Sequence, residues 1–485
     1  MTRRYGMWEI AVSGRADGNP FLDYQVFADI AGENEQKTVK GFYDGDGTYR
    51  VRFMPSFTGE YSYRIYGSFC WTEYTGTFTV EEADSHGMVC AEGVTLRYAD
   101  GTLYNSIGTT CYVWNLQKEE IQKNTLKTLK DSAFNKIRFC LFPKHYDYNF
   151  RNPVLFPFEG TPVDNSGINK QNFNEYKAET EGSSWDFEHL NLAYFKMLDG
   201  QIQALEDLGI EADIILFHPY DRWGFAKMTM EQNEFYLRYV LARYSAYRNV
   251  WWSLANEYDL CTYKTIEDWE QIAAWIVEDD PYGHLRSIHN CRKLYDFTKD
   301  WVTHCSIQRQ RGNLELDFIP EWLEQYKKPV VIDEMCYEGN IEQDWGNISP
   351  EEMLRRMWKT VVNGGYPGHG ECYDLENVWW SHGGVLHGES HKRFGLLLDM
   401  MNEANGKLLP YRYTGAATED ERYILHYYGE HRPDCKRYKF PGKTYRIEVI
   451  DTWEMTVKQA GTFTDSCCVE LPGKEYMALR MMQVD

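Results

Sequence analysis

The stretch Val250-Trp-Trp-Ser-Leu-Ala-Asn-Glu257 is a short apolar run that ends in an amide and a carboxylate. A stripe of apolar residues with helical spacing comes just before it, formed by Tyr236, Val240, Tyr244 and Tyr247. Residues three or four apart share one helix face, whereas a short apolar run is typical of a buried strand. The stretch therefore predicts a helix followed by a parallel strand, with polar residues at the carboxyl end of that strand.

The same helix-then-strand unit recurs on both sides of this stretch. Apolar helical stripes precede the runs 137–142, 214–217 and 285–288, and they consist of Leu126, Leu129 and Ala133, then Phe195, Leu198, Ile202 and Leu205, then Trp269, Ile272 and Ile276. Runs at 105–110, 302–307 and 330–332 bring the count to seven strands, with a weaker eighth near 365–372. Ser349 and Pro350 mark the start of a further helix.

Such alternation predicts an α/β fold, a (β/α)8 TIM barrel with insertions over residues 84–411. A doubly wound sheet fits less well, because no glycine-rich phosphate loop follows the first strand. Residues 1–83 alternate at period two, with Tyr49, Val51 and Phe53 on one face, which predicts an N-terminal β-sandwich. Similar alternation after the Pro441-Gly442 turn predicts a small C-terminal β-sandwich over 412–485.

The charge balance bears on the partners of the chain. Its 51 basic and 73 acidic residues give a net charge of -22, which repels phosphate backbones and anionic membranes, so we expect neither nucleic acid nor a membrane as a partner. Neither a signal-peptide run nor a membrane-length apolar stretch occurs, so we expect a cytoplasmic protein. The 12 cysteines lack CxxC spacing and are expected to be buried thiols, with a redox pair at Cys467-Cys468 as the alternative.

Polar side chains follow successive strands of the predicted barrel. They are Arg138, Lys144 and His145, then His218 to Trp223, then Asn256 and Glu257, then His289 and Asn290, then Gln308 and Arg309, then Asp333 and Glu334. Barrel enzymes carry their chemistry at the carboxyl ends of the strands. We single out Glu257 and Glu334, because each ends a very apolar strand on opposite sides of the barrel.

Two facing carboxyl groups suit the cleavage of a glycosidic bond. One protonates the leaving oxygen, and the other attacks the anomeric carbon or activates a water. A separation of about 5 to 5.5 Å would indicate retention of configuration, and about 6.5 to 9.5 Å would indicate inversion.

Two segments carry a family resemblance. Val250 to Glu257 resembles the strand-four signature of the clan A retaining glycoside hydrolases, and Lys328-Pro-Val-Val-Ile-Asp-Glu334 is similar to their strand-seven nucleophile segment. The domain layout, with the barrel opening Arg97-Tyr-Ala-Asp-Gly-Thr-Leu-Tyr-Asn-Ser-Ile-Gly-Thr-Thr110, most resembles the apiosidase-like glycosidases. Ser106-Ile-Gly-Thr-Thr-Cys-Tyr112 stands where that family usually has a run of the Trp-Leu-Gly-Asp-Thr-Ala-Trp type.

The resemblance implies roles for individual residues. Glu257 would be the proton donor and Glu334 the nucleophile, while Asn256 would hydrogen-bond the sugar 2-hydroxyl. Arg138 would hold Glu334 ionised, because a nearby guanidinium lowers the pKa of a carboxyl group. The remaining candidates for substrate binding are His145, His218, His289 and Gln308, with Trp114, Trp223, Trp379 and Trp380 as stacking platforms.

The predicted function is a retaining exo-glycosidase that removes a terminal β-linked or equivalent furanosidic sugar from a small oligosaccharide in a bacterium. We expect no cofactor and no metal, and a homo-oligomer is compatible with the sequence. Two alternatives stay open: a non-catalytic carbohydrate-binding protein on a glycosidase scaffold, and a metal-dependent barrel hydrolase. His382, His387, Glu389 and His391 would be the metal cluster, although no HExxH pattern occurs.

Overall fold

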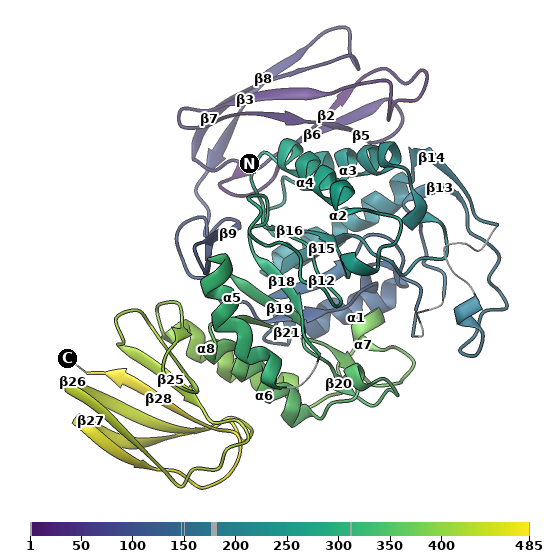
Figure 1. Ribbon diagram of the computed structural model, residues 1–485. Coiled ribbons are helices and arrows are strands. Elements are labelled where there is room, and N and C mark those ends of the chain that lie inside the picture. The colour runs from purple at the N-terminus through teal and green to yellow at the C-terminus, as the bar shows by residue number, and fades with distance from the viewer. Residues whose placement is uncertain (1, 147, 150, 176–181, 311–312, 485) are drawn as a thin grey trace.

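The computed structural model describes residues 2–146, 148–149, 151–175, 182–310 and 313–484. Figure 1 shows a central α/β body with a sheet domain at each end of the chain, the N-terminal one above it and the C-terminal one at its lower left. In the described part of the chain, no helix combines the length and the apolar character needed to cross a membrane.

The central body is the predicted barrel. Eight strands pair in parallel, in the order β17 (Arg286–Ser287), β16 (Val250–Ala255), β15 (Glu211–Phe217), β12 (Lys136–Cys140), β11 (Gly108–Thr110), β21 (Tyr366–His369), β19 (Val330–Glu334) and β18 (Cys305–Gln308). The Ser287 side chain connects β17 to β18, which closes the barrel. Its hydroxyl donates to the His304 carbonyl at 2.6 Å and accepts from the Ser306 N–H at 3.2 Å. The prediction of a (β/α)8 barrel is confirmed.

Helices cover the outside of the barrel, which explains the apolar strands. They are α1 (Glu119–Lys130), α2 (Leu192–Asp207), α3 (Met230–Tyr244), α4 (Ile266–Asp279), α5 (Ile319–Tyr326), α6 (Pro350–Val362) and α8 (Phe394–Glu403). The predicted stripe of α2 is fully buried against the sheet. The Ser349 side chain caps α6 by accepting from the Glu352 N–H at 3.2 Å, as its position before Pro350 predicted.

One cluster of charges lies inside the barrel and is formed by residues of three strands. The Lys136 ammonium of β12 donates to Asp213 of β15 at 2.8 Å and to Asp333 of β19 at 2.6 Å, and all three side chains are buried. Such a cluster is stable only because each charge has a close partner. It ties three barrel strands together.

The N-terminal strands form two sheets around one core. The first contains β1 (Thr2–Arg3), β8 (Tyr74–Glu81), β7 (Gly59–Tyr66), β3 (Phe27–Ala31) and β4 (Gln36–Lys40), and the second contains β2 (Trp8–Ser13), β6 (Thr48–Phe53) and β5 (Phe42–Tyr43). Ile30 and Ile65 of the first sheet and Tyr49 and Val51 of the second belong to a single buried cluster. A sandwich therefore stands on this side of the barrel, as predicted.

Buried arginines fix this sandwich to the barrel. Arg52 of β6 and Arg243 of α3 both form bidentate pairs with Asp199 of α2, at 2.6 to 3.0 Å, and Arg243 also donates to Asp44 at 2.9 Å. The two guanidinium groups are 5% and 1% exposed, so water screens these pairs poorly.

The C-terminal strands form a six-stranded antiparallel sheet, in the order β23 (Leu409–Pro410), β24 (Gly415–Ala417), β25 (Tyr423–Tyr427), β28 (Met477–Gln483), β26 (Cys435–Asp451) and β27 (Thr456–Glu470). Trp358 of α6 stacks on Tyr427 of β25, with ring centroids 5.3 Å apart, which attaches the sheet to the barrel helices. All 12 cysteines of the chain are unpaired thiols, Cys467 and Cys468 on β27 among them.

Candidate active site

The two singled-out carboxylates lie at the same mouth of the barrel. Glu257 comes directly after Ala255 and Asn256 at the end of β16, and Glu334 is the last residue of β19. Both are nearly buried, at 6% and 5% exposure. Glu257 has a left-handed backbone with φ 49° and ψ 55°, which is rare outside glycine and typical of functional positions.

The amide of Asn256 joins the two carboxylates. Its Nδ2 donates to Glu257 Oε2 at 3.4 Å, and its Oδ1 accepts from Arg138 Nη1 at 2.8 Å. The same Arg138 nitrogen lies 3.3 Å from Glu334 Oε1. The hydroxyl of Tyr112 donates to Glu334 and lies 3.1 Å from Asn256 Oδ1. One connected network therefore contains both carboxyl groups.

The surroundings push the pKa values of the two carboxyl groups apart. Burial favours the neutral form of Glu334, but the hydrogen bond and charge of His289, together with Arg138 and Lys144, lower the pKa of Glu334 to about 2. Burial and then the charge of Glu334 raise the pKa of Glu257 above its usual value. Paired titratable groups with pKa values of opposite direction are the pattern of an acid and a nucleophile in one site.

His289 connects Glu334 to the interior of the barrel. Its Nε2 lies 3.4 Å from Glu334 Oε1 and 3.2 Å from Gln308 Oε1, and its Nδ1 lies 3.0 Å from the Ser306 hydroxyl. The Ser306 hydroxyl donates to Asp333, so it accepts from Nδ1. Both ring nitrogens therefore face oxygen acceptors, which suits a ring that donates to the carboxylate. His289 and Gln308 lie where the sequence predicted them, beside the pair.

Lys144 lies in a cage of aromatic rings at the same mouth. Its Nζ is 3.4 Å from the ring centroid of Tyr112, 4.4 Å from that of Tyr220 and 4.6 Å from that of Trp380. The hydroxyl of Tyr220 donates to Glu257 Oε2. Burial lowers the pKa of Lys144, and the charges of Glu257 and Glu334 oppose that shift. The cage thus holds a cation within electrostatic reach of both carboxyl groups.

A cavity of about 760 Å³ opens beside Glu257. Burial and the charge of Glu257 raise the pKa of Cys291 to about 12, and this thiol is part of the cavity wall. Gln308 is also part of the wall, whose full lining is Cys291, Arg292, Gln308, Arg309, Gln310, Glu315, Phe318 and Trp322. The cavity therefore approaches the carboxylate pair through Cys291 and Gln308, although neither Glu257 nor Glu334 is part of its wall.

Two predicted stacking platforms lie in the core instead. Trp114 is fully buried and packs edge-on against Phe139 at 5.8 Å, and Trp379 is 1% exposed with its Nε1 donating to Thr109 at 2.9 Å. A platform needs an open ring face, which neither indole has. Trp380, at 4% exposure, packs on Tyr112 and lies in the cage around Lys144. Trp223, at 1% exposure, is buried as well, so of the four predicted platforms only Trp380 lies beside Lys144 and the carboxylate pair.

Three other residues that were predicted to bind the substrate form hydrogen bonds with loops around the barrel mouth instead. His218 Nε2 hydrogen-bonds the Phe142 carbonyl at 3.1 Å, and burial lowers the pKa of His218 to about 3, so its ring is neutral. His145 Nε2 lies 2.8 Å from the Phe173 carbonyl, and Trp223 Nε1 donates to Asn152 at 3.1 Å. These contacts belong to the long insertion between β12 and α2, which contains the hairpin β13 (Phe158–Thr161) and β14 (Ser184–Leu190).

Three residues of the network received no role from the sequence, although Lys144 and Tyr220 were noted at strand ends. Tyr112 follows β11, Lys144 follows β12, and Tyr220 follows β15. All three obey the rule that polar side chains gather at the carboxyl ends of barrel strands. Applying that rule to tyrosine as well as to charged residues would have found Tyr112 and Tyr220.

Comparison with known protein families shows which family patterns the sequence matches. The pattern of the apiosidase-like catalytic domain matches residues 91–396, and two domains of unknown function match the flanks, DUF5060 at 1–68 and DUF5605 at 413–482. No curated protein matches the chain at a significant level.

Two solved structures are similar to this chain, one of them over its whole length. A Bacteroides vulgatus ATCC 8482 protein provisionally named a glycoside hydrolase is 36% identical, with a TM-score of 0.92, and the match covers 100% of this chain and 99% of that one. A glycoside hydrolase family 5 protein from the same organism shares the fold at 15% identity and a TM-score of 0.62, over 82% of this chain and 93% of that one.

Proposed function

The chain belongs to the apiosidase-like family, and on that premise we propose that it is a glycoside hydrolase that cleaves a terminal sugar by double displacement, with retention of configuration. Glu334 is the nucleophile and Glu257 is the acid and base. The observation that carries the proposal is the Asn256 amide, which joins two carboxyl groups with oppositely shifted pKa values.

The first step needs an ionised Glu334 and a protonated Glu257. Arg138, Tyr112 and His289 all contact Glu334 and stabilise its negative charge. The carboxylate attacks the anomeric carbon while Glu257 gives its proton to the departing oxygen, which leaves as an alcohol. A glycosyl ester on Glu334 results.

The second step reverses the role of Glu257. Formation of the ester removes the charge of Glu334, which is one of the two causes that raise the pKa of Glu257. Glu257, now a carboxylate, takes a proton from water as that water attacks the anomeric carbon, and the ester bond breaks to release the sugar and return Glu334 as a carboxylate. Lys144 in its aromatic cage stabilises the Glu257 carboxylate at this stage.

The substrate that we propose is a small oligosaccharide or glycoside. The cavity of about 760 Å³ lies in the range of sites that hold one small molecule, and Trp322 and Phe318 give its wall aromatic surface. The net charge of -22 supports a neutral sugar rather than a polyanion. An exo-acting bacterial enzyme of the cytoplasm remains part of the proposal.

A panel of nitrophenyl glycosides, furanosides included, tests the function. We expect turnover of at least one member, with the first sugar product observed by NMR in the anomeric configuration of the substrate. An inverted first product would contradict the nucleophile role of Glu334. Sugar binding without turnover across the panel would favour a carbohydrate-binding protein instead.

A further inference from the structure

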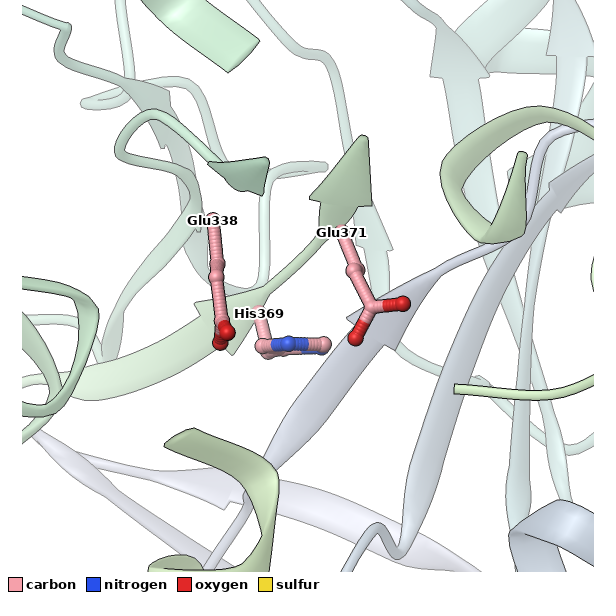
Figure 2. Close-up of side chains that lie close together, drawn as sticks. All are labelled: Glu338, His369 and Glu371. Atoms are coloured by element: carbon pink, nitrogen blue, oxygen red, sulfur yellow. The ribbon is translucent and has the colours of Figure 1, made fainter. Parts of the chain in front are cut away.

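A second group of buried polar side chains lies next to the barrel mouth. It contains Glu338 of β20 (Glu338–Gly339), His369 at the end of β21, and Glu371 of β22 (Glu371–Cys372), with at most 1% of each residue exposed. One ligand atom from each residue lies within 4.8 Å of the other two. Figure 2 shows the imidazole lying between the two carboxylates.

His369 has a nitrogen with no use in the described structure. Its Nδ1 lies 3.1 Å from the Thr109 hydroxyl, whereas its Nε2 is buried and finds no hydrogen-bond partner among the described residues. Phe134 stacks on the ring at 4.9 Å, and Phe394 packs against it at 5.4 Å. The ring therefore cannot turn freely to satisfy Nε2 elsewhere, and a buried unpaired nitrogen needs an explanation.

Gly388 keeps the space between the carboxylates open. A Cβ atom at this position would lie 2.4 Å from Glu338 Oε1 and 2.6 Å from Glu371 Oε2. Gly388 does not have a positive φ, so its backbone alone does not require glycine. Any side chain at this position would therefore clash with both carboxylates, so only glycine lets the loop pass this close to them.

Hydrogen bonds to the loop 387–390 explain why Glu338 and Glu371 are buried, but they do not explain the whole group. Glu371 accepts from the N–H groups of His387 and Gly388 at 2.6 and 2.7 Å. Glu338 accepts from the N–H groups of Glu389 and Ser390 at 2.7 and 3.1 Å, and from the hydroxyls of Tyr373 and Ser390. These bonds leave two carboxyl groups facing each other in the interior, and they do not provide a partner for His369 Nε2.

We propose that Glu338, His369 and Glu371 bind one divalent zinc ion, which ties β20, β21 and β22 together beside the loop 387–390. Two carboxylates and a dication give a neutral buried site, which removes the cost of unpaired charge. One imidazole and two carboxylates fit zinc, whereas calcium and magnesium take oxygen ligands. His391, whose Nδ1 is also unpaired in the described chain and which interacts electrostatically with His369 and Glu338, is a candidate for a fourth position.

This site shares only His391 with the predicted metal cluster. Of the four residues considered there, His382 hydrogen-bonds Asn149 at 3.0 Å, and Glu389 pairs with Lys392 at 2.5 Å. The zinc role is structural, and it does not depend on the proposed glycosidase chemistry.

Metal analysis of the untagged full-length chain tests the proposal. We expect about one zinc per chain after growth with added zinc, and an X-ray absorption spectrum with nitrogen and oxygen ligands only. Sulfur ligands would show that the free cysteines hold the ion and would overturn the assignment. Less than a tenth of an equivalent of zinc, with no change in melting temperature on adding zinc, would also overturn it.

A pair of histidine variants locates the site. His369→Gln is expected to weaken zinc binding by at least about 10-fold in competition with a chromophoric chelator. The matched control is His426→Gln, because His426 is also buried with unpaired ring nitrogens, but lies in the C-terminal sheet. Equal zinc affinity in the wild type and in His369→Gln would contradict the site.

Thermal melts separate this proposal from catalysis. Zinc should raise the melting temperature of the chelator-treated wild type by a few degrees. Glu334→Gln should bind zinc as the wild type does, whatever its activity. Should His369→Gln fail to fold, the stoichiometry and the absorption spectrum of the wild type still decide the question.

Discussion

Lys136 and Arg138 lie two residues apart on β12, point into the same barrel and are equally buried, but their surroundings differ. Lys136 lies between Asp213 and Asp333 at hydrogen-bond distance, and we call these three residues the floor of the barrel. At the mouth, Arg138 uses only Nη1, and its Nε and Nη2 are buried without a partner among the described residues. The charges of the floor are paired with one another, whereas the mouth contains buried hydrogen-bond donors with no partner among the described residues.

This difference separates charges that hold a fold together from charges that act on a substrate. A fully paired buried cluster ties strands together, and removing one member leaves an uncompensated charge. A cluster with unused donors and oppositely shifted pKa values is arranged for chemistry. Substitutions at the floor should therefore lower stability, and substitutions at the mouth should lower activity.

Glu334→Gln is expected to have the largest effect. The change removes the nucleophile, so kcat should fall by about 10⁴-fold or more. Folding should persist, because the amide keeps an oxygen for Arg138. Steady-state kinetics with circular dichroism measures both, and activity within a few-fold of wild type would refute the assignment.

Asp333→Asn tests the neighbouring residue, which belongs to the floor. The change leaves Lys136 with one charged partner, so the free energy of unfolding should fall by about 3–5 kcal/mol. Denaturant titration measures this loss. A kcat/KM reduced as strongly as in Glu334→Gln, with stability unchanged, would break the distinction between floor and mouth.

Glu257→Gln should depend on the leaving group. Loss of the proton donor should lower kcat/KM by about 10²–10³-fold for glycosides with poor leaving groups, and much less for activated phenols. A Brønsted series of aryl glycosides measures the slope. An equal loss across the series would contradict a role in protonating the leaving oxygen.

The pH profile gives the smallest expected effect. Activity should rise as pH rises through the lowered pKa of Glu334, about 2, and fall as pH rises through the raised pKa of Glu257. The charge of Lys144 lowers both pKa values, so Lys144→Met should move both limbs to higher pH, by up to about 1 unit.

Lys264→Met is the matched control for that shift. Lys264 is also largely buried and lies 4.8 Å from the ring centroid of Phe217, but the charges that act on it are those of Cys261, Asp268 and Asp221. Its loss should leave both limbs of the profile in place. A shift equal to that of Lys144→Met would show that the change is not specific to the cage.

The barrel could be predicted because helix and strand periodicities are local properties of the sequence. The strand ends at Glu257 and Glu334 followed from the same local signal, and the polar residues of each strand end were found together. The burial of Trp114 and Trp379 could not be predicted, because it depends on the packing of segments that are distant in sequence. The floor could not be predicted for the same reason, because Lys136, Asp213 and Asp333 come from three strands that are distant in sequence.

The shared arginines between the N-terminal sandwich and the barrel have a consequence for dissecting the protein. Asp199 receives one guanidinium from each domain, and Arg243 reaches back to Asp44. A shortened chain that begins at the barrel would lose Arg52 and Asp44 together, and would expose the Asp199–Arg243 pair of α2 and α3 to water. We therefore expect the catalytic unit alone to be less stable than the same unit in the whole chain.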